Sequence, residues 1–148
     1  MTTSTTTATA TPERAAMSYG ISTVVDAPFP ETLERVRAAL QREGFGILTE
    51  IDFAATLQAK IGAVMDPYVV LGACNPPLAH QALSTEPAIG LLLPCNVAVR
   101  ADGERTIVEA LDPQVMVTLT GNAQVQRLAD DATARLRAAL ATLTAPSG

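Results

Sequence analysis

Two short segments of this 148-residue chain place a cysteine beside an asparagine and near a proline. One reads Cys74-Asn75-Pro76 and the other reads Pro94-Cys95-Asn96. Because proline cannot occupy a regular central position in a strand ladder, each segment is expected where a strand ends or bulges. Cys74 also precedes a helix start, where unpaired N–H groups and the helix dipole are expected to lower the pKa of its thiol.

Two thiols and two carboxamides brought close together would support one of three kinds of site. They could anchor a small ligand through polar contacts. They could catalyse a thiol-dependent or redox reaction, with Cys74 as nucleophile, Cys95 as resolving thiol and His80 as base. They could also hold a soft metal, with His80 as third ligand and Glu50 or Glu86 as fourth, although this spacing matches no known zinc pattern.

A plainer interpretation stays open for each of these residues. The cysteines could be small buried apolar residues, and the asparagines could satisfy backbone groups at caps and bulges. Glu50 and Asp52 could act as an acid–base pair, but Asp52 has the simpler role of a helix cap. The sequence therefore assigns no catalytic residue, metal or cofactor. The candidate binding residues are Cys74, Asn75, His80, Cys95, Asn96 and Glu50.

The composition narrows the class of partner. The net charge is −5 and aromatic residues make up 3%, which argues against nucleic acid and against anionic membranes. Apolar residues make up 48%, which excludes a disordered chain. Two cysteines are too few for a disulfide scaffold, and the sequence has neither a secretory signal nor an apolar run of about 18 residues. We therefore expect a cytoplasmic protein with reduced thiols.

Apolar periodicity, caps and turn residues predict alternating strands and helices. Strands are expected at 18–25, 47–51, 68–74, 91–100 and 106–111, and helices after Pro30, after Asp52, over 76–86 and over 125–143. The order β-α-β-α-β-α-β-β-α predicts an α+β fold, with a single curved β-sheet and helices packed mainly on one face. Residues 17–143 are expected to form a single globular domain between a flexible tail, 1–16, and a frayed end, 144–148.

Local details of three predicted elements can be stated more closely. Gly44 suits a left-handed position that ends the first helix. The short helix after Asp52 is expected to bury Leu57 and Ile61. The Asp102-Gly103 pair is a strong signal for a two-residue hairpin turn. That turn would give the cross-strand pairs Val99–Thr106 and Val97–Val108 and, less favourably, Arg100–Arg105.

Covering both faces of the predicted sheet is a problem for a chain of this length. The strands at 68–74 and 91–99 are apolar on both sides, so both faces need a cover. Four helices are too few to provide it. A second copy of the chain would supply the missing cover, which predicts a homodimer.

Several segments taken in order resemble a known bacterial family, the domain of unknown function 302. They are Gly44 to Asp52, Leu71 to Pro76, Gly90 to Val97 and Asp112-Pro113. The resemblance spans about residues 18–143. It implies a compact α+β domain that forms a homodimer, and it implies no established activity, substrate or cofactor. The two cysteine segments match family segments, but no role is implied for them.

Overall fold

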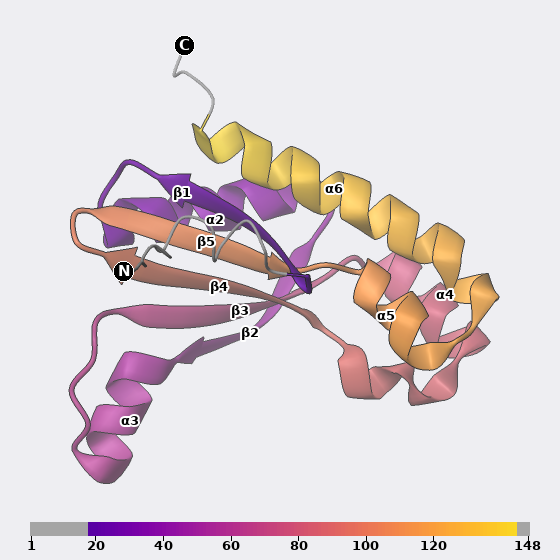
Figure 1. Ribbon diagram of the computed structural model, residues 1–148, viewed down its shortest axis with the longest axis horizontal. Helices are drawn as coiled ribbons and strands as arrows, with labels where there is room; N and C mark the ends of the chain where they lie inside the picture. Colours follow the sequence, from indigo (N-terminus) through magenta and orange to yellow (C-terminus); the bar gives the residue numbers. More distant parts are fainter. Residues whose placement is uncertain (1–17, 145–148) are drawn as a thin grey trace, which may run out of the picture.

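The computed structural model describes residues 18–144, in which five antiparallel strands form one open sheet in the order β1-β5-β4-β3-β2 (Figure 1). The strands are β1 (Gly20–Val25), β2 (Gly46–Asp52), β3 (Tyr68–Cys74), β4 (Cys95–Asp102) and β5 (Arg105–Leu111). The α-helices are α2 (Phe29–Arg42), α3 (Phe53–Ile61), α4 (Pro76–Thr85), α5 (Gln114–Thr120) and α6 (Gln126–Thr144). Two 3₁₀ helices are η1 (Pro87–Leu92) and η2 (Ala123–Val125). The predicted α+β fold is confirmed. The predicted tail 1–16 lies outside the described residues, as does the predicted frayed end 144–148 except for Thr144, which is the last residue of α6.

Helices α2 and α6 pack together on one face of the sheet (Figure 1). Val36 and Leu40 of α2 meet Leu136 and Leu140 of α6 over the central strands. Leu71, Val97 and Val108 supply the sheet side of this core, and all three are almost completely buried. Full burial of a Val or Leu side chain contributes about 1.5–3 kcal/mol, so this layer holds the helices on the sheet.

The local signals at helix ends are confirmed. Gly44 has φ +88°, and it follows α2 in the left-handed conformation that glycine adopts without strain. The Asp52 carboxylate caps α3 by accepting from the N–H of Ala55. The Asn75 side chain caps α4 by accepting from the N–H of Leu78, and Pro76 occupies the first helical position.

The hairpin register differs from the prediction. The turn lies at Gly103-Glu104, so Val99 pairs with Val108 rather than with Thr106. The predicted Arg100–Arg105 clash is thereby removed. Arg105 instead faces Asp102 at 3.6 Å, and Arg100 forms an ion pair with Glu109 at 3.2 Å. The observed register keeps the apolar face intact and also pairs the charges.

Three further expectations about elements are corrected. The strand expected at 91–100 starts only at Cys95, because residues 87–92 form η1 and Pro94 cannot donate to the ladder. Helix α3 has no buried residue, and Ile61 is 74% exposed. Helix α5 was not predicted, because its sequence, rich in valine and threonine, has a low intrinsic helix propensity.

The sheet face opposite α2 and α6 carries the alternate residues of the same strands. Val70 and Ala98 face each other across β3 and β4 there, and both are only half-buried. Ile51 of β2 is 43% exposed.

No helix in residues 18–144 is both long and apolar enough to cross a membrane.

Gly72, in the middle of β3, provides a test of this packing. A Cβ atom at this position would collide with the Thr49 side chain and lie 2.8 Å from Cγ of Pro94. We expect Gly72→Ala to lower the free energy of unfolding by about 1–3 kcal/mol, because neighbouring strands must shift. Gly46→Ala is the matched control, since its Cβ would meet only the Cys74 carbonyl oxygen at 3.8 Å. Urea denaturation that gave equal losses for the two variants would contradict this register.

Candidate ligand-binding cavity

Strand pairing brings the two cysteine segments to the same end of the sheet. Strands β3 and β4 are antiparallel neighbours, and Ala73 lies directly opposite Cys95. Cys74 therefore ends β3 beside the residue that begins β4. Because α4 starts immediately after Cys74 and η1 ends shortly before Cys95, helical segments crowd around this end.

A small cavity lies at this strand end, which we call the strand-end cavity. Its volume is about 50 Å³, and its walls come from the ends of β3 and β4 and from α4, η1, α5 and α6. Cys74, Asn75 and Cys95 all contribute to its wall. Apolar side chains make up most of the rest, among them Leu78, Ala82, Ile89, Met116, Leu128 and Ala132. Three of the six candidate residues therefore converge on one apolar space.

Asn75 is the polar residue in the cavity wall, and it is only 9% exposed. Its Oδ1 atom accepts from the N–H of Leu78 at 3.2 Å, which turns the Nδ2 group away from α4. Among residues 18–144 no acceptor hydrogen-bonds to this Nδ2 group. The Nδ2 group is not fully enclosed by the described residues, so water can satisfy it.

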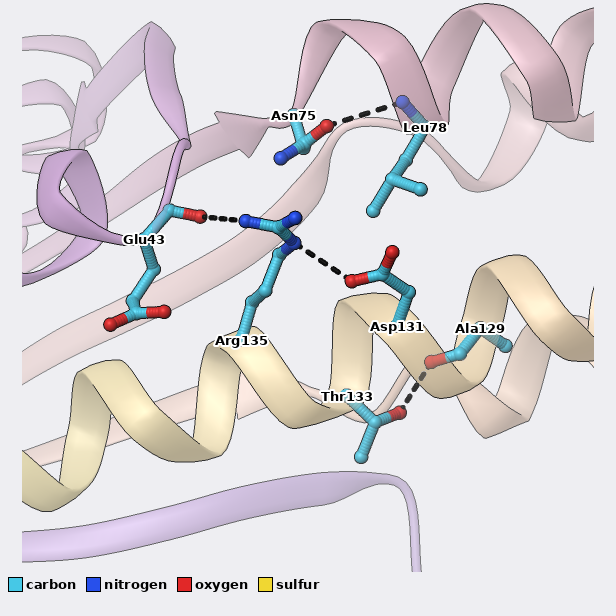
Figure 2. A network of polar contacts seen from close by, with 7 residues as sticks. All are labelled: Glu43, Asn75, Leu78, Ala129, Asp131, Thr133 and Arg135. Carbon is cyan, nitrogen blue, oxygen red and sulfur yellow. Dashed lines mark hydrogen bonds and ion pairs between the residues drawn. The ribbon is translucent and has the colours of Figure 1, made fainter.

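Arg135 of α6 lies close to Asn75 (Figure 2). Its Nε atom donates to Asp131 at 2.8 Å, and its Nη1 atom donates to the Glu43 carbonyl oxygen at 3.1 Å. These two bonds hold the guanidinium in place and link α6 to the end of α2. Further along α6, Thr133 bonds its own helix by donating to the Ala129 carbonyl oxygen (Figure 2).

Both thiols have a raised pKa, which corrects the expectation for Cys74. Burial raises the pKa of the Cys74 thiol. Burial, and to a smaller extent the neighbouring Cys74, raises the pKa of the Cys95 thiol to about 11. Asn75 rather than Cys74 caps α4. Both cysteines are free of disulfides, and both are protonated at neutral pH.

The other three candidate residues lie away from the strand-end cavity. Asn96 is exposed and faces Gly72 on the opposite side of the sheet from Cys95. His80 is exposed on α4 and is not part of the cavity wall. Glu50 pairs with Arg37 of α2 at 2.5 Å, and the pKa of its carboxyl is lowered by that guanidinium. Over residues 18–144 no three His, Cys, Asp or Glu side chains gather as a metal site.

Several residues of this site were not anticipated from the sequence. Met116 lines the cavity from α5, a helix that the apolar pattern did not indicate. Leu128 and Ala132 belong to the apolar stripe predicted for the last helix, but the stripe alone does not show what it faces. Arg135 had no local signal, because its partner carbonyl belongs to Glu43, 92 residues earlier.

These features define an open-sheet α+β domain with a small apolar cavity at the ends of its central strands. A model of the family described as domain of unknown function DUF302 matches residues 21–143, and the chain belongs to that family. The chain is also similar to the crystal structure of an uncharacterised conserved DUF302 protein from Bacillus stearothermophilus. The two share 29% sequence identity and a TM-score of 0.78, over 84% of this chain and 98% of the other. No curated protein matches the chain.

The raised pKa values predict slow alkylation of both thiols. With a pKa of about 11, only about one Cys95 side chain in ten thousand is a thiolate at pH 7, and the thiolate is the reactive form. We expect iodoacetamide to modify both cysteines more slowly than a free thiol, with rates that rise with pH above 8. Mass spectrometry of the single variants Cys74→Ala and Cys95→Ala resolves the two sites. Fast labelling of Cys74 at pH 6 would restore the reactive-thiol hypothesis.

Proposed function

We propose that this protein is a small-ligand-binding module whose ligand occupies the strand-end cavity and contacts Cys74, Asn75 and Cys95. The observation that carries the proposal is the convergence of these residues, from segments about 20 positions apart, on one apolar space. An apolar pocket with few polar groups is the usual form of a small-molecule site.

The cavity also limits the size and character of the ligand. An engineered apolar cavity of about 150 Å³ takes up benzene, and the strand-end cavity is about one third of that volume. The part of the ligand buried there is therefore only a few non-hydrogen atoms in size and mainly apolar. The polarisable sulfur atoms of Cys74, Cys95 and Met116 suit such a group.

The thiol-dependent and metal-binding alternatives have less support. A nucleophilic cysteine needs a lowered pKa or a nearby base, whereas both thiols have raised pKa values and His80 is not in the cavity wall. A soft-metal site needs a third ligand close to the two thiols. The proposed further ligands His80, Glu50 and Glu86 are not part of the cavity wall. Glu50 pairs with Arg37, and Glu86 accepts a hydrogen bond from Nδ2 of Asn122 at 2.9 Å.

We also propose that the module acts as a homodimer through the sheet face opposite α2 and α6. That face carries the Arg100–Glu109 ion pair, so a second copy related by a two-fold axis offers each charge its opposite. A partner subunit would also cover the half-buried Val70 and Ala98.

Filling the cavity tests the ligand-binding proposal. Ala132 lines the cavity from α6, whereas Ala134 is exposed on the same helix. We expect 1-chlorobutane, used as a small apolar probe, to shift amide NMR signals of the residues around the cavity. Ala132→Leu should weaken this binding at least tenfold because its side chain fills the space, and Ala134→Leu should leave it unchanged.

Two outcomes would contradict the proposal. One is binding of the probe by a folded Ala132→Leu protein with the affinity of the unmodified chain. The other is the absence of any signal change at saturating probe. Thermal unfolding of both variants shows that the proteins compared are folded.

The dimer is tested by the mass of the protein in solution. We expect light scattering after gel filtration to give about twice the 15.4 kDa of one chain. Ala98→Arg should halve that mass, because it places a large charge at the centre of the proposed interface, whereas Ala134→Arg on the exposed side of α6 should not. A monomeric unmodified protein at micromolar concentration would contradict the dimer.

A further inference from the structure

Three sulfur-bearing side chains line the strand-end cavity, and each comes from a different element. Cys74 ends β3, Cys95 begins β4 and Met116 lies in α5. No histidine, aspartate or glutamate among residues 18–144 lines this cavity. The wall therefore offers a metal ion sulfur ligands without the imidazole or carboxylate ligands that complete many zinc sites.

These three residues are neighbours in the packing of the chain. Cys95 and Met116 belong to the same buried apolar cluster. Cys74 directly follows Ala73, which is paired with Cys95 across β3 and β4. The two thiols are also close enough for Cys74 to contribute to the raised pKa of Cys95. Strand pairing and the packing of α5 thus bring sulfur atoms from three separate segments to one space.

The size of the cavity and the type of its ligands restrict the metal. The cavity volume is about 50 Å³, less than two water molecules occupy in the liquid at about 30 Å³ each, so an ion must enter without its hydration shell. Mg²⁺ keeps several waters and prefers oxygen ligands, which excludes it. Zn²⁺ takes four ligands from Cys, His, Asp and Glu, and only two such side chains line the cavity. Thiolate and thioether ligands together favour Cu(I).

We propose that the strand-end cavity is also a Cu(I) site, in which the Cys74 and Cys95 thiolates and the Met116 thioether bind one ion. This goes beyond the proposed function, because the occupant is a metal ion rather than an apolar molecule. Its third ligand is Met116 rather than His80 or a carboxylate. Each thiol releases its proton to water as it binds, so one Cu(I) replaces two protons. The copper enters as Cu(I), and no electron is transferred.

The test is competition for Cu(I) with bicinchoninate, whose coloured copper complex loses absorbance when the protein removes the ion. We expect the unmodified protein, kept free of oxygen, to remove one Cu(I) per chain. Cys74→Ala, Cys95→Ala and Met116→Leu should each weaken binding about tenfold or more, because losing a ligand costs at least as much as losing a residue that orients one. X-ray absorption at the copper edge should show only sulfur neighbours.

Met65→Leu is the matched control for Met116→Leu. Met65 lies between α3 and β3, is 39% exposed and does not line the strand-end cavity. Its variant should bind Cu(I) like the unmodified protein. Because methionine and leucine have similar volumes, both variants are expected to stay folded, which thermal unfolding checks.

Three results would overturn the copper site. They are failure of the unmodified protein to remove Cu(I) from bicinchoninate, equal Cu(I) affinities of folded Met116→Leu and the unmodified protein, and nitrogen or oxygen neighbours of the bound copper. Binding of 1-chlorobutane separates this proposal from the proposed function. If 1-chlorobutane binds and Cu(I) does not, only the copper site is overturned. If Cu(I) binds and 1-chlorobutane does not, only the apolar-ligand function is overturned.

Discussion

The antiparallel pairing of β3 with β4 is the constraint on which the site depends. This register sets Ala73 opposite Cys95 and so brings Asn75 and Pro94, distant in sequence, to one end of the sheet. A shift of one residue would turn every side chain of one strand to the other face, and Cys95 would leave the cavity. Val97 and Val99 oppose such a shift, because both are completely buried and would become exposed.

The helices complete the cavity as a consequence of how the sheet is covered. Helix α6 is held over the sheet by Leu136 and Leu140, while its first turns extend past the strand ends. Leu128 and Ala132 there meet α4, and Met116 of α5 closes another side. One long helix therefore serves both the main core and the cavity wall. The same helix also carries Arg135, which bonds the Glu43 carbonyl oxygen at the end of α2.

Features set by neighbouring residues could be predicted from the sequence. The cap by Asn75, the helix start at Pro76 and the left-handed Gly44 each follow from a side chain or backbone preference within one turn. The register of the β4–β5 hairpin was harder to predict. Its turn lies one residue later than expected, and Arg100 forms an ion pair with Glu109. Both registers are acceptable to the apolar pattern, and the observed one also pairs these charges.

Long-range properties of the site could not be predicted in the same way. The pKa of the Cys74 thiol is raised by burial, whereas the local helix start suggested that the pKa would be lowered. Asn96 and Cys95 were grouped as neighbours in sequence, but adjacent strand residues point to opposite faces. The approach of Arg135 to Gly44 depends on the docking of α6 against the end of α2, which no local pattern encodes.

A crystal structure determined under xenon pressure would test the central claim most directly, because xenon enters dry apolar cavities and is located by its electron density. The prediction is a xenon atom in the strand-end cavity, in contact with Cys74, Cys95 and Met116. A cavity that excludes xenon, or one filled by well-ordered hydrogen-bonded water, would contradict an apolar ligand site there.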